Sequence, residues 1–141
     1  MAEETFFTQS EEATQKWAEQ FARNLKVGDA VALIGDLGAG KTVFARGIAR
    51  GFNFKGYVTS PSFALVNEYD ADVFIYHIDL YRLEPDADWD EIGIDHYLTH
   101  EGITLIEWPE RVNHLDIEFD YQIAISYKSE GEREIRVIKR E

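Results

Sequence analysis

The chain has 141 residues, of which 45% are hydrophobic and 13% aromatic, enough apolar material for the core of one domain. We therefore expect a single domain over residues 1–141. No stretch is apolar for long enough to span a membrane, and the N-terminus lacks the basic and apolar parts of a signal peptide. These features predict a soluble, cytoplasmic protein without membrane contacts. The absence of cysteine excludes a disulfide framework and a thiolate zinc site.

The net charge of −13 argues against direct binding of nucleic acid. Nucleic-acid backbones are bound chiefly by Lys and Arg, which neutralise phosphates. We expect no DNA partner, and we expect any RNA to be held mainly by another protein or by a local basic patch that composition does not reveal. A simpler interpretation is that the acidic surface serves only solubility.

The first predicted element is a helix. Thr8 and Glu11 have the spacing of a capping box. Apolar residues then recur every four positions, at Ala13, Trp17, Phe21 and Leu25. This period places them on one face of a helix, which the turn at residues 27–29 would end.

A strand, a glycine-rich turn and a second helix are predicted next. Residues 30–34 are continuously apolar, as in a strand that is covered on both faces of a mostly parallel sheet. Residues 35–40 are rich in glycine, and residues 41–50 have helical periodicity. The apolar side of that helix would consist of Val43, Phe44, Ile48 and Ala49.

The rest of the chain predicts two hairpins and one more buried strand. Residues 63–69 and 73–78 flank the turn Asp70-Ala71-Asp72, and residues 119–127 and 135–137 alternate around a turn at residues 128–132. We expect the second hairpin at the edge of the sheet. Between them, a short helix is expected around Trp89 to Leu98 and a strand at Ile103 to Ile106.

Residues 35–42 match the phosphate-binding pattern G-x-x-x-x-G-K-[ST], known as the P-loop, at every fixed position. The segment lies between a predicted strand and a predicted helix, as the motif requires. Its residues are Gly35, Asp36, Leu37, Gly38, Ala39, Gly40, Lys41 and Thr42. We therefore predict an α/β fold, a P-loop NTPase-like three-layer sandwich whose mixed sheet has a parallel core and antiparallel hairpins.

The spacing of this motif follows from its chemistry. Glycines let the backbone curl so that successive N–H groups point at the β-phosphate, next to the positive end of the following helix. Lys41 would reach the β- and γ-phosphate oxygens, and the hydroxyl of Thr42 would bind Mg²⁺. The simpler alternative is a glycine-rich turn with an exposed lysine.

Two acidic residues that end predicted strands are candidates for holding the metal. Asp79 ends the run of residues 73–78, and Glu107 ends the run of residues 103–106. P-loop proteins hold Mg²⁺ with a carboxylate at the end of a neighbouring strand, so we predict that both residues lie in its inner or second shell. Either residue could instead be a helix cap or a solvated turn residue. ATP is favoured over GTP because no N-K-x-D sequence follows Thr42.

Taken together, these residues resemble the TsaE (YjeE) ATPases, which bacteria need for making threonylcarbamoyladenosine in tRNA. Beyond the P-loop, the similarity rests on residues 60–69, 76–83 and 106–110, which read SPSFALVNEY, YHIDLYRL and IEWPE. The resemblance covers nearly the whole chain. It implies that Thr42, Asp79 and Glu107 surround Mg²⁺ and that the Ser60-Pro61 segment is a switch-like loop facing the γ-phosphate.

The resemblance also implies further nucleotide contacts and protein partners. Trp108 would lie beside the nucleotide, with the alternative that it only anchors the core. Glu11 and Arg133 occupy places where the N-terminal segment and the last hairpin of the family approach the nucleotide, although Arg133 could equally be a solvated strand residue. Members act with TsaD and TsaB, which carry out threonylcarbamoyl transfer to adenosine 37 of tRNA.

The reaction that we expect is slow Mg²⁺-dependent ATP hydrolysis, in which Lys41, Asp79 and Glu107 position and stabilise charge and partners complete the site. Arg82 could stabilise charge or simply pair with Glu84 or Asp86. Two alternatives are a P-loop small-molecule kinase and a nucleotide-gated binding module with little turnover. The kinase alternative lacks support, because residues 84–101 contain none of the arginines that a kinase lid requires.

Overall fold

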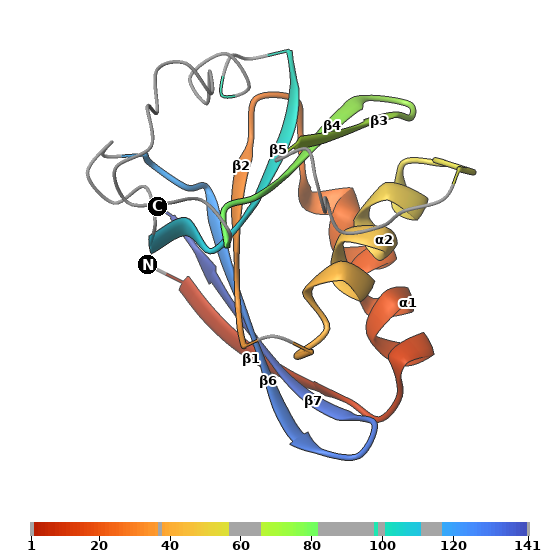
Figure 1. The fold of residues 1–141 in the computed structure, drawn as a ribbon, viewed down its shortest axis with the longest axis vertical. Helices are drawn as coiled ribbons and strands as arrows, with labels where there is room; N and C mark the ends of the chain where they lie inside the picture. Colours follow the sequence, from red (N-terminus) through yellow and green to blue (C-terminus); the bar gives the residue numbers. More distant parts are fainter. Residues whose placement is uncertain are drawn as a thin grey trace.

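The apolar strand predicted over residues 30–34 lies in the middle of a mixed sheet. The computed structural model describes residues 2–36, 38–56, 66–81, 98, 101–110 and 117–140, and in these it has seven strands in the order β1-β7-β6-β2-β5-β4-β3 (Figure 1). β2 (Ala30–Ile34) is parallel to both of its neighbours, β5 (Gly102–Glu107) and β6 (Tyr121–Ser129). Four of its five residues are buried. A strand enclosed in this way favours a continuous apolar run over an alternating one.

Antiparallel hairpins flank this parallel centre, as the sequence predicts. β3 (Val66–Asp70) pairs with β4 (Phe74–Asp79), which is itself parallel to β5. β6 pairs with β7 (Glu132–Lys139), with a bulge between Tyr127 and Ser129. The predicted mixed sheet with a parallel core and antiparallel hairpins is therefore confirmed. Residues 63–65 of the first predicted hairpin lie outside the described residues.

The prediction that the second hairpin forms the edge of the sheet is wrong. A further strand, β1 (Ala2–Thr8), pairs antiparallel with β7 and forms that edge, and β6 lies against β2. Most of β1 is exposed, and Phe6 is the one apolar residue of the strand that packs against the core among those described. Exposed edge strands tolerate charged residues such as Glu3 and Glu4, so β1 lacks the alternation by which strands are found in sequence.

The predicted first helix is present but is capped by a different residue. α1 (Glu11–Phe21) begins after Ser10, whose Oγ accepts a hydrogen bond from the Ala13 N–H at 3.0 Å. Thr8 instead ends β1, and its hydroxyl lies 2.6 Å from that of Thr14. The capping-box assignment to Thr8 is wrong because two capping residues compete here, and pairing with β7 places Thr8 in the sheet.

Both longer helices cover one face of the sheet (Figure 1). α2 (Lys41–Gly51) buries Phe44, Ile48 and Ala49 completely. α1 packs beside it, and the chain then forms a short 3₁₀ turn, η1 (Ala22–Asn24). An aromatic cluster joins the helices to β6, and its members are Trp17, Phe21, Phe44 and Tyr121.

The opposite face carries a smaller apolar cluster that includes Ile78, Leu80 and Ile106. The helix predicted around Trp89 to Leu98 falls on residues of which only Leu98 is described, so the third layer of the predicted sandwich stays a prediction. Within the described residues, no helix is both long and apolar enough to cross a membrane.

The contact between α1 and α2 depends on glycine at position 47. A Cβ added to Gly47 would lie 2.4 Å from the carbonyl oxygen of Gln15 and 2.5 Å from the Cβ of Ala18. Real Cβ atoms do not approach other atoms so closely, so any side chain here would force the helices apart.

We therefore expect Gly47→Ala to lower the free energy of unfolding by about 1–3 kcal/mol, because overpacking outweighs the better helix propensity of alanine. Urea denaturation measures this change. Gln20→Ala, at an exposed position of α1, is the control and should change stability by less than about 0.5 kcal/mol. Unchanged stability of Gly47→Ala would show that the helix contact is not tight.

Candidate functional site

The phosphate-binding motif forms the turn between the end of β2 and the start of α2. Gly40 precedes the helix with φ +114, a backbone conformation that side chains disfavour. At Gly35 a Cβ would lie 2.6 Å from the carbonyl oxygen of Ile125 on β6. Glycine is therefore required at both ends of the turn, by conformation at one and by space at the other. Leu37 lies outside the described residues.

The start of α2 is suited to receive an anion. Gly40 has no side chain with which to bond the first amides of the helix, and the first turn contains no acidic residue. The first N–H groups of a helix lack partners within it and carry the positive end of the helix dipole. This end of α2 can accept a phosphate group without a competing carboxylate in its own first turn.

Lys41 is folded into the site rather than extended into solvent. Its side chain is 5% exposed, and Nζ donates a hydrogen bond to the Gly35 carbonyl oxygen at 2.6 Å. Nζ also lies 3.9 Å from Glu107 Oε1 and 4.0 Å from the centre of the Trp108 ring. Burial lowers the pKa of Lys41, and the charges of Glu107 and Asp79 oppose that shift.

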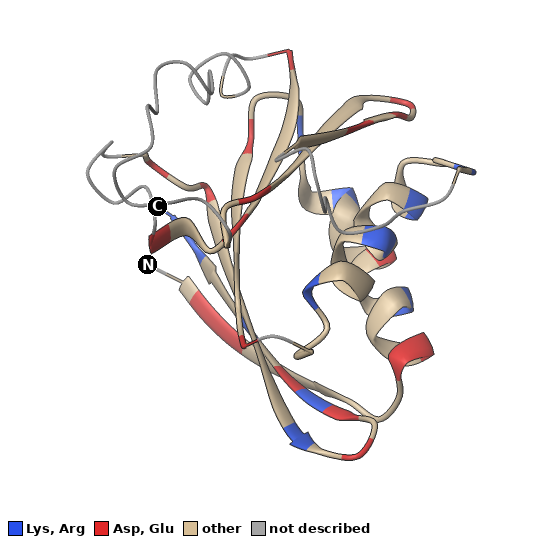
Figure 2. Cartoon of the chain, in the orientation of Figure 1, with Lys and Arg blue, Asp and Glu red and all other residues tan. Residues whose placement is uncertain are grey.

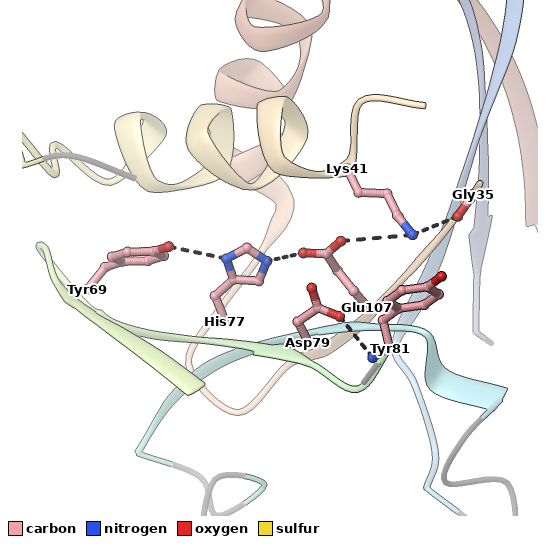
Figure 3. Close-up of polar contacts among 7 residues, drawn as sticks. All are labelled: Gly35, Lys41, Tyr69, His77, Asp79, Tyr81 and Glu107. Carbon is pink, nitrogen blue, oxygen red and sulfur yellow. Dashed lines mark hydrogen bonds and ion pairs between the residues drawn. The ribbon is translucent and has the colours of Figure 1, made fainter. Parts of the chain in front are cut away.

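The two predicted metal-binding carboxylates lie side by side at the carboxyl ends of two neighbouring strands (Figure 3). Asp79 ends β4 and Glu107 ends β5, and the two residues are direct partners in the parallel register. Glu107 is also the register partner of Leu33 on β2, two residues before the phosphate-binding turn. Because these three strands are parallel, both carboxylates and the turn lie together at the carboxyl ends of the strands.

The side chain of Asp79 is hydrogen-bonded to a backbone amide two residues later, and its anionic form is less favourable than that of an exposed aspartate. Its Oδ1 accepts a hydrogen bond from the Tyr81 N–H at 3.0 Å. Burial raises the pKa of Asp79, and the neighbouring charge of Glu107 raises it further, whereas the Tyr81 amide and Lys41 lower it. The net shift is upward, as expected for two carboxylates that share a confined site.

Two residues that were not predicted complete this side of the site. His77 is fully buried, and its Nε2 lies 2.5 Å from Glu107 Oε2. Its Nδ1 lies 3.2 Å from the hydroxyl of Tyr69, which is 4% exposed. The only signal in the sequence is an imidazole inside an otherwise apolar run, and such a residue is more commonly part of the core.

Trp108 follows β5 and has φ +60, an uncommon value for a residue other than glycine. Its ring lies under the Lys41 ammonium and 4.8 Å from the ring of Tyr81. The structure thus brings Trp108 to the phosphate-binding turn, beside the place where the nucleotide is expected.

Arg133 and Glu11 lie on the other side of the turn. Arg133 Nε donates a hydrogen bond to the carbonyl oxygen of Ala39 at 2.8 Å, and its guanidinium carbon lies 4.8 Å from the centre of the Tyr127 ring. Glu11 is largely exposed and pairs with Arg46 at 3.5 Å. Both border a cavity of about 90 Å³ next to Gly38 and Gly40, so each is near the turn.

A larger cavity, of about 500 Å³, opens on the turn itself. Its walls are the turn and the end of β6, namely Gly35, Asp36, Gly38, Ala39, Ile125, Ser126 and Tyr127. The cavity is large enough for a small ligand. The predicted switch segment at Ser60-Pro61 and the predicted charge-stabilising Arg82 lie outside the described residues.

The groups present fit a magnesium-bound polyphosphate. Thr42 stands in the first turn of α2 and offers a hydroxyl, and Asp79 and Glu107 offer carboxylates, so all three supply the hard oxygen ligands that Mg²⁺ prefers. No group of three or more His, Cys, Asp or Glu residues that could hold a metal ion occurs among the described residues. Mg²⁺ is commonly held by one or two carboxylates together with water and phosphate oxygens.

Comparison with known proteins gives one consistent result. The family model described as "Threonylcarbamoyl adenosine biosynthesis protein TsaE" matches residues 8–135. The "tRNA threonylcarbamoyladenosine biosynthesis protein TsaE" of Bacillus subtilis is 37% identical over 129 residues, which are 91% of this chain and 80% of that protein. The protein of the same name from Aquifex aeolicus is 41% identical over 136 residues, 94% of this chain and 93% of its own length.

A solved structure extends the similarity to the fold. The crystal structure of YdiB from Bacillus subtilis superposes with a TM-score of 0.80 and 32% sequence identity. The match covers 98% of this chain and 86% of YdiB. The similarity in sequence and the similarity in fold therefore both extend over most of the chain.

The raised pKa of Asp79 has a consequence for stability. A carboxyl group whose pKa is higher in the folded state binds its proton more tightly there, so the stability that it contributes is greatest at low pH and is lost as the pH rises through that pKa. Asp79→Asn keeps an oxygen for the Tyr81 amide and removes the charge.

We therefore expect Asp79→Asn to unfold at a higher urea concentration than the wild type at pH 7, without nucleotide or Mg²⁺. The difference should shrink as the pH falls toward the ordinary aspartate pKa of 3.8. A variant that is less stable than the wild type at pH 7 would contradict this electrostatic description.

Proposed function

The chain belongs to the TsaE family of threonylcarbamoyl adenosine biosynthesis proteins, and we propose that it binds ATP and Mg²⁺ and hydrolyses ATP in support of that pathway. The role would be to assist threonylcarbamoylation of adenosine 37 in tRNA. One observation carries the proposal. The phosphate-binding turn, Lys41 and the two carboxylates of Asp79 and Glu107 lie together at the carboxyl ends of β2, β4 and β5.

In this proposal the first residues of α2 and Lys41 bind the phosphates. The amides at the start of the helix would receive the β-phosphate, because Gly40 leaves them uncapped. Lys41 would exchange the Gly35 carbonyl for phosphate oxygens, and it lies close enough to the turn to do so by rotating its own side chain. The buried position of the ammonium strengthens its attraction for phosphate compared with an exposed lysine.

Thr42, Asp79 and Glu107 would hold the magnesium ion. A bound Mg²⁺ supplies positive charge that neutralises the β- and γ-phosphate oxygens. The protein contributes two carboxylates from paired positions on neighbouring strands, so strand pairing holds their backbones side by side. Catalysis by positioning and charge stabilisation is the expected mode of phosphoryl transfer in P-loop proteins.

The nucleoside would occupy the larger cavity beside the turn. That cavity continues from the phosphate-binding residues to Tyr127, which is 61% exposed. Arg133 connects the turn to this ring through its contacts with Ala39 and Tyr127. An aromatic ring and a guanidinium next to a phosphate site are suitable groups for packing against a purine.

We propose that the protein acts with TsaB and TsaD rather than alone on tRNA. The net charge of −13 opposes contact with a polyanion, and β3, β4 and β5 contain no Lys or Arg. Figure 2 shows basic residues mainly on the helices and on β6 and β7, with acidic residues on the strands, the turns and α1. A tRNA would therefore be held by the partners, in the cytoplasm.

Lys41→Ala should abolish ATP binding, because it removes the ammonium group that would bind the phosphates. Among the described residues, Lys41 is the cation whose side chain contacts the Gly35 carbonyl of the turn. Isothermal titration calorimetry with ATP and Mg²⁺ measures the affinity. Arg50→Ala, which removes an exposed cation from the far end of the same helix, is the matched control and should bind like the wild type. Retained affinity in Lys41→Ala would reject the proposed phosphate site.

Hydrolysis should be slow for the purified chain and faster when TsaB and TsaD are added, because partners would complete the site. Single-turnover assays with radiolabelled ATP measure both rates. No hydrolysis under either condition, with ATP still bound, would favour a nucleotide-gated binding module. Faster transfer of phosphate to a metabolite than to water would favour a kinase.

A further inference from the structure

A line of buried polar side chains leads from β3 to the nucleotide site. It consists of Tyr69 on β3, His77 on β4 and Glu107 on β5, and it ends at Lys41 (Figure 3). Tyr69, His77 and Glu107 are 4%, 0% and 3% exposed. Three side chains linked by successive hydrogen bonds are therefore almost fully buried on one face of the sheet.

His77 stands where the core would accept an apolar residue. Its neighbours along the same face, Ile75 on β4 and Leu105 on β5, are both fully buried. Burying an imidazole is unfavourable unless both ring nitrogens find partners, and here Tyr69 and Glu107 provide them. A leucine would need no partners, so packing alone does not account for a histidine.

The contact with His77 leaves Glu107 with one oxygen for the site. Because a carboxylate accepts hydrogen bonds, we assign Nε2–H of the imidazole as the donor to Oε2, and Oε1 lies 3.9 Å from Lys41 Nζ. Tyr69 binds the other ring nitrogen and so fixes the orientation of the ring. Groups that orient a metal-binding side chain from behind act in this way in many metal sites.

Asp79 and Glu107 differ in how they are held. Asp79 is fixed by a backbone amide two residues later, and its side chain has two torsions. Glu107 has a longer side chain with three torsions, and within the described part of the chain the His77 imidazole hydrogen-bonds to its carboxylate. Glu107 is thus oriented by the side chain of His77, whereas Asp79 is oriented by the backbone amide of Tyr81.

We propose that His77 is a positioning residue for the nucleotide site, and that it orients Glu107 so that Oε1 faces Lys41 and the magnesium-bound phosphates. The inference rests on the proposed function, because it takes Glu107 to act on bound Mg²⁺. Tyr69 supports the same orientation from the far side of the ring. His77 touches neither nucleotide nor metal in this role.

The test compares two polar substitutions at one position. The side-chain amide of His77→Gln can replace Nε2–H toward Glu107, whereas the shorter amide of His77→Asn cannot reach it. Both variants carry similar polar groups into the core, so a purely structural role would affect them alike. Thr104→Val, at a buried position on the other face of β5, controls for a general loss of stability.

The measured quantity is the ratio of ATP affinities with Mg²⁺ and with EDTA, determined by calorimetry. We expect His77→Asn to reduce this ratio by about 10–100-fold, the usual effect of removing a group that orients a metal ligand. His77→Gln and Thr104→Val should retain it. In a Glu107→Gln background, His77→Asn should cause no further loss, because its effect is transmitted through Glu107.

The inference would be overturned, with the proposed function left intact, if the wild type and His77→Asn had equal affinity ratios. The same holds if His77→Asn caused its full loss of the ratio in the Glu107→Gln background. A wild-type protein that binds no ATP would overturn the proposed function and this inference with it. Proton NMR of the nucleotide-free wild type adds a readout that needs no ligand. A downfield imidazole N–H resonance of His77 that shifts in Glu107→Gln is expected, and a resonance that does not respond would contradict the contact even if the His77 variants fail to fold.

Discussion

The parallel register of β2, β5 and β4 is the constraint on which the site depends. Leu33 pairs with Glu107, and Glu107 pairs with Asp79, so the proposed phosphate-binding turn and both carboxylates lie together at the carboxyl ends of these strands. Side chains in paired strands alternate between faces, and a shift by one residue would turn both carboxylates to the other side of the sheet. A shift would also move the fully buried apolar residues of these strands out of the packing that they make in the present register.

The same arrangement places the charges of Lys41, Asp79 and Glu107 close together in a largely buried site. Lys41 is buried between Gly35, Glu107 and Trp108. Burial lowers the pKa of Lys41 and raises the pKa of Asp79, because it disfavours the charged form of each. Buried charges are unfavourable unless they are well paired, and the like charges of Asp79 and Glu107 oppose each other. Such a site is less stable than an apolar one and gains its best electrostatic partners when an anion and a cation bind together.

Sequence patterns predicted the parts of the structure that local chemistry determines. The turn at residues 35–42, the buried strand before it and the acidic residues at two strand ends each have a short-range signature. β1 was missed because an exposed edge strand with Glu3 and Glu4 carries no periodic signal. The role of His77 was missed because its partners, Tyr69 and Glu107, are 8 and 30 residues away in the chain and meet it only through strand pairing.

A crystal structure with Mg²⁺ and a non-hydrolysable ATP analogue would show where the phosphates bind. We predict phosphates in the turn of residues 35–42, Lys41 Nζ moved from the Gly35 carbonyl to phosphate oxygens, and Mg²⁺ beside Thr42, Asp79 and Glu107. A complex in which the analogue binds elsewhere, while Lys41 keeps its contact with Gly35, would contradict the account.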